Sequence, residues 1–156
     1  MSLSKQIANQ IREVLLNGTW VATNYKVQLE DVDWKQATSK VSDLNTIADL
    51  IFHIDYYLAG LIQVFNGESL DIKDKFSYDA PQITSATEWD KRKQKLFNDS
   101  ETFANLVEKM TEEELMAPFV EAKYGNNYIN IQAMIEHSYY HLGQIVLIKK
   151  LLKVNS

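Results

Sequence analysis

Hydrophobic residues recur at intervals of three and four along four long stretches of the chain, the spacing that places them on one face of an α-helix. These stretches cover residues 3–16, 44–66, 87–110 and 130–153. The second carries the most continuous apolar stripe, formed by Ile47, Leu50, Ile51, Ile54, Leu58, Leu61, Ile62 and Phe65. The chain has only five glycines and two prolines, too few for the many turns of an all-β protein. The pattern therefore predicts an all-α protein built on four long helices.

Residues typical of helix ends flank these stretches. Asn66-Gly67 predicts the end of the second helix, because glycine accepts the left-handed conformation that commonly closes a helix. Ser85 and Glu88 have the spacing of a capping box and predict the start of the third helix. Asn130 is predicted to cap the last one.

The connections between the four helices are unequal. Residues 17–43 and 67–86 form long connections after the first and second helices, whereas loops within bundles usually have about 2–8 residues. Connections of this length permit parallel neighbours and can supply walls for a site. Thr111 and Glu114 predict one short turn of helix, and residues 119–129 are predicted to form a strand-like return.

Length and charge restrict the class of protein. A chain of 156 residues corresponds to a single domain over residues 1–156, at roughly 150 residues per domain. Hydrophobic residues make up 46% and charged residues 24%, which is ordinary globular composition and excludes disorder as the main state. The net charge of −5 argues against binding to the phosphate backbone, so no nucleic-acid partner is expected.

The chain contains no cysteine, which excludes disulfides, thiolate zinc sites and a thiol nucleophile supplied by the protein. No signal peptide pattern opens it, and no uncharged apolar run approaches the roughly 18 residues of a membrane span. A cytoplasmic protein without membrane association is therefore expected.

The three histidines carry the candidate chemistry. His137 and His141 are four residues apart on the last predicted helix, so their side chains are neighbours one turn apart. His53 holds the same position on the second helix, at the flank of its apolar stripe. If these helices pack together, three imidazoles can converge and form a metal site with an open coordination position.

Spacing alone also allows a second interpretation, in which the histidines are ordinary residues at the boundary between core and surface. Imidazole nitrogen binds zinc, nickel, copper and iron, so three histidines do not decide which metal is held. Both interpretations remain open at the level of spacing.

Two short segments resemble motifs of the DinB-like family. Residues 51–55 (IFHID) resemble the segment that contains the first histidine of the family, and residues 137–145 (HSYYHLGQI) resemble its last-helix motif. The order of the elements agrees over most of the chain, including Trp20 in the loop after the first helix. One departure is Leu142, which stands where many members have arginine.

The resemblance implies a four-helix bundle of the DinB/YfiT-like type, commonly a homodimer. It also implies a divalent metal, such as zinc, nickel or iron, with His53, His137 and His141 as its ligands. Other members are transferases and isomerases that use a small thiol such as bacillithiol or mycothiol.

A chain without cysteine must receive its thiol from a cosubstrate. The resemblance therefore implies a metal-dependent transferase whose partners are a small-molecule thiol and an electrophile. Its catalytic residues, beyond the metal ligands, are not identified. The alternative is a metal-binding protein without catalysis, with a role in stress response or interaction.

Three other enzyme classes lack their motifs. A ferritin-like di-iron bundle needs Glu-x-x-His on two helices, whereas Glu136 directly precedes His137. Residues 137–141 read HSYYH and lack the glutamate of a zinc protease. No G-x-S-x-G motif of a serine hydrolase occurs.

Two polar residues are predicted to support the metal ligands. Asp49 precedes His53 by one helical turn and is a candidate acceptor for the proton on its second ring nitrogen. Gln144 follows His141 by three residues and is a candidate for the same role. The tyrosines beside the ligands are expected chiefly to pack: Tyr56, Tyr57, Tyr139 and Tyr140.

Overall fold

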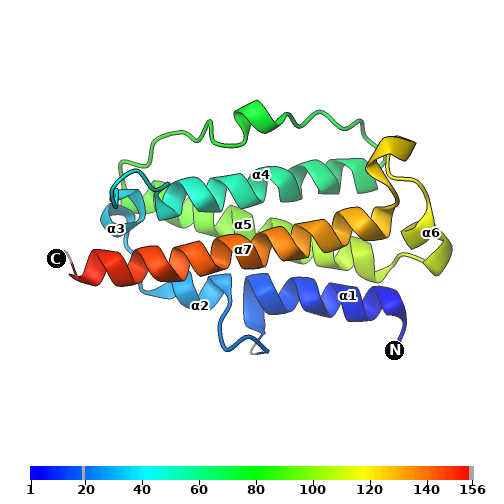
Figure 1. The fold of residues 1–156 in the computed structure, drawn as a ribbon, viewed down its shortest axis with the longest axis horizontal. Coiled ribbons are helices and arrows are strands. Elements are labelled where there is room, and N and C mark those ends of the chain that lie inside the picture. Colours follow the sequence, from blue (N-terminus) through cyan, green and yellow to red (C-terminus); the bar gives the residue numbers. More distant parts are fainter. Residues whose placement is uncertain (19, 155–156) are drawn as a thin grey trace.

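Four long helices lie side by side along the length of the molecule in a computed structural model that describes residues 1–18 and 20–154 (Figure 1). They are α1 (Leu3–Arg12), α4 (Ile47–Phe65), α5 (Ala86–Glu108) and α7 (Asn127–Val154). A π-helical segment, η1 (Glu13–Asn17), continues α1. The described residues form no β-strand. The predicted all-α fold with four long helices is confirmed.

Shorter elements fill the connections. The first connection contains α2 (Tyr25–Glu30) and α3 (Trp34–Thr38), which the hydrophobic pattern did not resolve. A short helix, α6 (Glu112–Met116), follows α5 and begins with the predicted capping box of Thr111 and Glu114. Single 3-10 turns are η2 (Asp74–Phe76) and η3 (Ala122–Tyr124).

The second long connection runs back along α4. Helices α4 and α5 point in the same direction. Residues 67–85, which connect them and are here called the strap, therefore run back along the length of the bundle (Figure 1). Helix α4 contacts both α5 and α7, and α1 contacts α5 on the other side. A parallel pair joined by a long connection is an arrangement that the unequal connections permitted.

Two sequence predictions near the last helix are wrong. Asn126, rather than Asn130, caps α7, because its side-chain oxygen accepts the backbone N–H of Ile129 at 2.8 Å. The amide of Asn130 instead donates to the carbonyls of Tyr124 and Asn126. Residues 119–129 form no strand. One isolated bridge joins Pro118 to Asn126, and the chain between them turns through η3, so no ladder of hydrogen bonds develops.

The apolarity of α4 is explained by its place in the core. Its length and its mean hydropathy of 1.3 are sufficient for a membrane span, but 56% of that window is buried inside the bundle. Core helices of water-soluble proteins commonly have both properties. A capping box of Thr46 and Asp49 starts this helix and sets the register of its buried face.

Trp89 connects α5 to the turn between α2 and α3, and its replacement tests the core. Its side chain is 1% exposed, and its indole N–H donates to the carbonyl of Val32 at 2.7 Å. We expect Trp89→Phe to lower the free energy of unfolding by about 2–3 kcal/mol, because it leaves a cavity and a buried carbonyl without a donor. Urea denaturation measures this loss. Trp20→Phe is the matched control, since Trp20 is 87% exposed and its replacement should change stability by less than about 0.5 kcal/mol.

Candidate metal centre

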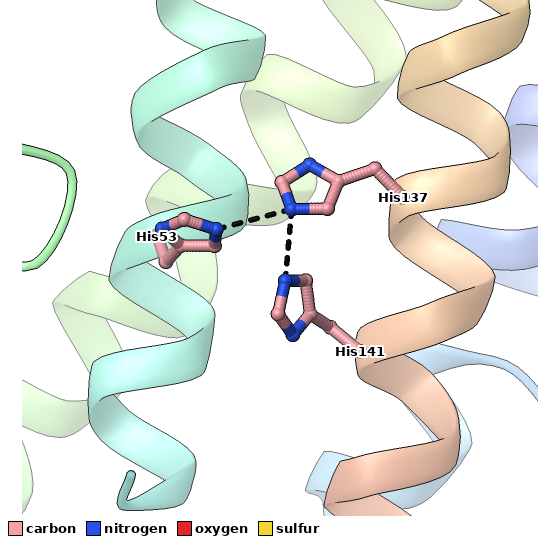
Figure 2. A group of neighbouring side chains, drawn as sticks. All are labelled: His53, His137 and His141. Atoms are coloured by element: carbon pink, nitrogen blue, oxygen red, sulfur yellow. Dashed lines mark hydrogen bonds between the residues drawn. The ribbon is translucent and has the colours of Figure 1, made fainter. Parts of the chain in front are cut away.

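Three imidazoles from two helices meet between α4 and α7. His53 projects from the middle of α4, and His137 and His141 project from successive turns of α7 (Figure 2). Ser138 is fully buried on α7, and its backbone carbonyl accepts the hydroxyl of Tyr25 at 2.8 Å. This contact ties α2 to α7 beside the histidines.

The Nε2 atoms of the three rings face one another. His137 Nε2 lies 3.0 Å from His53 Nε2 and 2.8 Å from His141 Nε2 (Figure 2). One ligand atom from each ring lies within 4.8 Å of the other two. The packing of α4 on α7 therefore produces the convergence on which a shared ion depends.

The outer ring nitrogens of two histidines contact groups that only accept hydrogen bonds. His53 Nδ1 lies 3.3 Å from the carbonyl oxygen of Ser77, in the strap. His141 Nδ1 lies 2.6 Å from Oε1 of Gln144. Each Nδ1 must carry the proton to donate in these contacts, so the Nε2 atom of each neutral ring presents a lone pair to the centre.

The three Nε2 atoms do not carry enough protons to form a hydrogen bond in both of their short contacts. Two lone pairs, from His53 and His141, point at His137, and a neutral His137 ring has at most one Nε2–H to donate. At least one of the two short N···N contacts thus lacks a proton in the neutral cluster. A cation at the centre would satisfy all three nitrogens at once.

Burial keeps the cluster uncharged. It lowers the pKa of His137 to about 4, and repulsion from the His141 and His53 rings acts in the same direction. The pKa of His53 is lowered, first by burial and then by His141. Burial also lowers the pKa of His141, against the opposing hydrogen bond with Gln144. Neutral imidazole is the form that binds metal, so at neutral pH no proton has to leave these rings before a metal binds.

The donor set fits a divalent transition metal. In a tetrahedral zinc site, nitrogens about 2.0–2.1 Å from the ion lie roughly 3.3–3.4 Å apart. The two contacts of His137 Nε2 are 3.0 and 2.8 Å, a few tenths of an ångström shorter than this spacing, and the ligand atoms all lie within 4.8 Å of one another. Three nitrogens leave a coordination position for a further ligand, as in catalytic rather than structural zinc sites.

A cleft adjoins the centre on the side of His137. It has a volume of about 550 Å³ and lies between α4, α7 and the strap. Leu61, Ile72 and Phe119 are among its apolar walls, and Lys73 and Asp74 are among its polar residues. The volume is within the range of small-molecule sites.

The structure corrects the prediction for Asp49. Its carboxylate accepts the backbone N–H of Thr46 at 3.0 Å as part of the cap of α4, and the partner of His53 is the strap carbonyl. The backbone N–H of Thr46 and the ring N–H of His53 compete for the carboxylate oxygens of Asp49, and Thr46 is the closer of the two along the chain. Gln144 lies at His141, in the contact described above.

The neighbouring aromatic residues differ in position. The Tyr57 ring meets the rings of His53 and His137 edge to face, with centroids 5.1 and 5.4 Å away, and the Tyr140 ring meets His141 in the same way at 5.0 Å. Tyr56 contacts the strap, and Tyr139 packs against the core. Leu142, at the position of the family arginine, is buried in the core.

Sequence reasoning missed the two strap residues that touch His53. These are Ser77 and Tyr78, whose ring stacks on the imidazole at a centroid distance of 4.1 Å. Ser77 contributes a backbone carbonyl, which any residue could supply, so no motif could have indicated it. The only available signal was the unusual length of the connection.

A second buried ionisable residue lies two positions from His53 but faces α5. Asp55 Oδ2 accepts from Lys95 at 2.6 Å, and Oδ1 has no hydrogen-bond partner among the described residues. Burial raises the pKa of Asp55 to about 7, although Lys95 opposes the shift. This carboxyl is not part of the histidine cluster.

Comparison with known proteins agrees with this geometry. The family model of the DinB superfamily matches residues 21–145, well over half of the chain, and this range includes all three histidines. The chain therefore belongs to the DinB superfamily. No match was found among curated proteins or among solved structures.

Loss of one ligand should abolish metal retention. We expect His141→Ala to weaken zinc binding by more than about 100-fold, since even the loss of an outer partner of a ligand typically costs 10–100-fold. Elemental analysis and zinc titration measure this change.

The metal should also raise the melting temperature of the wild type and not of the variant. Gln132→Ala, on the same helix and bonded to Tyr128, is the control and should bind like the wild type. Equal zinc binding by His141→Ala would contradict the assignment.

The pH dependence of stability gives a metal-independent test. The pKa of His137 is about 4 in the folded protein and about 6.5 in the unfolded chain, so between these values the unfolded state binds more protons. In the presence of a chelator, stability from this group is therefore present above pH 6.5 and is lost as pH falls toward 4.

The measurement compares the wild type with His137→Asn by urea denaturation at pH 7.5 and pH 4.5. The wild type should lose more stability than the variant between these values, and contributions from groups outside the histidine cluster, such as Asp55, cancel in the difference. An equal loss would show that His137 is not held neutral by the fold.

Proposed function

We propose that this protein is a divalent-metal-dependent transferase that joins a low-molecular-weight thiol to an electrophile. The observation that carries the proposal is the set of three histidine Nε2 atoms that face one another next to an open cleft. A purely structural metal site is normally closed by four protein ligands, whereas this set has three.

The charge of the centre favours a sulfur ligand. Three neutral imidazoles contribute no negative charge, so a bound divalent ion would keep its full charge and would lower the pKa of a thiol enough to form thiolate at neutral pH. The chain has no cysteine to occupy the remaining position itself. A thiol from a cosubstrate is therefore the nucleophile that suits this site.

The residues around the centre support binding and exclusion of water. The apolar walls of the cleft, such as Leu61 and Phe119, would cover the body of an electrophile. Tyr57 lies between the histidines and the strap, and its hydroxyl donates to Asp74 at 2.8 Å. This hydrogen bond holds the edge of the cleft beside His137.

In the proposed reaction the sulfur forms a bond to carbon, the thiol loses its proton to solvent, and the leaving group departs with its bonding electron pair. No oxidant or reductant is required. The reaction therefore needs only the two substrates and the metal.

Turnover of a generic electrophile tests the proposal. Protein loaded with zinc, nickel or iron is mixed with monochlorobimane and, in turn, with bacillithiol, mycothiol, glutathione or cysteine. We expect at least one thiol to be conjugated faster than in the uncatalysed reaction, with chloride released. His141→Ala should abolish the acceleration, and Gln132→Ala should retain it.

The opposite result has a definite meaning. If metal-replete protein accelerates conjugation with none of these thiols, the transferase proposal is overturned. Retained zinc binding in that case would favour the alternative of a metal-binding protein without catalysis.

A further inference from the structure

The strap contacts His53 on the side away from α7. The Ser77 carbonyl lies 3.3 Å from Nδ1, and the Tyr78 ring lies nearly parallel to the imidazole, with an interplanar angle of 10°. Ser77 is buried, so its carbonyl is withdrawn from water. These two contacts determine what the outer edge of His53 meets.

Tyr56 attaches the strap to α4. Its hydroxyl accepts the backbone N–H of Lys73 at 2.8 Å and donates to the backbone carbonyl of the same residue at 3.0 Å. Both polar backbone groups of Lys73 are thus satisfied by one side chain. The hydrogen bond from Tyr57 to Asp74 attaches the next residue of the strap.

Gly60 sets the distance between the strap and α4. A Cβ atom at this position would lie 2.5 Å from Cγ2 and 2.8 Å from Cδ1 of Ile72. Contacts this short do not occur, so any larger residue would displace Ile72. The Ile72 side chain of the strap can keep this position against α4 only while residue 60 has no Cβ.

A third attachment holds the other end of the strap. The guanidinium of Arg92, on α5, donates to the carbonyl of Pro81 at 2.5 Å and to the carbonyl of Ala48, on α4, at 3.4 Å. The segment that contains Ser77 and Tyr78 is therefore held on both sides, from Lys73 and from Pro81.

We propose that the strap is a positioning element for His53, and that Tyr56 and Gly60 maintain the Nδ1–H tautomer of this ligand from a distance. No hydrogen bond or ring contact joins either residue to the three histidines within the described part of the chain. The importance of this tautomer for metal affinity rests on the proposed function.

The physical reason is the chemistry of the carbonyl group. A carbonyl only accepts, so it selects the tautomer with the proton on Nδ1 and leaves the Nε2 lone pair free for a metal. Water can donate as well as accept. If the strap moves and water replaces the carbonyl, the Nε2–H tautomer becomes populated, and that form cannot bind at the centre.

Two variants test the proposal, each with a matched control. Tyr56→Phe removes the attachment to Lys73, and Tyr128→Phe removes a phenol hydroxyl that accepts from the side chain of Gln132. Gly60→Ala places a Cβ against Ile72, whereas Gly143→Ala, in α7, places one where no atom lies within 4 Å. Circular dichroism shows whether each variant folds. If Gly60→Ala does not fold, Tyr56→Phe still tests the proposal.

The direct readout is long-range ¹H–¹⁵N correlation of the histidine rings at pH 7.5 in metal-free protein. We expect His53 to be the Nδ1–H tautomer in the wild type and in both controls, and to gain Nε2–H character in Tyr56→Phe and Gly60→Ala. Zinc titration should show about 10-fold weaker binding for these two variants.

Folded test variants that keep the wild-type tautomer of His53 would overturn the proposal. A wild-type protein that binds no zinc would overturn the proposed function instead, because the tautomer is read without metal. The two failures are therefore distinguishable in the same set of samples.

Discussion

The constraint on which this structure depends is the burial of three imidazoles that face one another. Burial disfavours a charge on these rings and lowers their pKa values, and one cation could satisfy the nitrogens that face one another. The packing of α4 on α7 imposes the constraint, because it brings His53 within hydrogen-bonding distance of His137. The arrangement is one that could hold a metal ion.

The topology of the bundle supplies the rest of the site. Because α4 and α5 run in the same direction, the segment that connects them must run back along the bundle (Figure 1). The returning segment places Ser77 and Tyr78 against His53 and forms one wall of the cleft beside His137. A bundle with short loops would have neither feature.

Local competition explains the predictions that failed. Asp49 has the right spacing from His53, but the backbone N–H of Thr46, at the start of α4, lies nearer and takes its carboxylate. Asn126 and Asn130 are both plausible caps, and the bridge at Pro118 decides in favour of the first. In each case several groups close together along the chain could make the same hydrogen bond, and spacing alone does not say which of them does.

The sequence by itself determined the four long helices and the candidate ligands. Helical periodicity is a local property, and His137 and His141 are neighbours in any helix. Only the tertiary structure decided which groups face the outer ring nitrogens, where the cleft opens, and how close His53 comes to the other two. These depend on side-chain packing and on backbone carbonyls, and a backbone carbonyl is the same in every residue. For this reason no residue motif marks the strap's contribution to the site, and only the length of the connection indicates it.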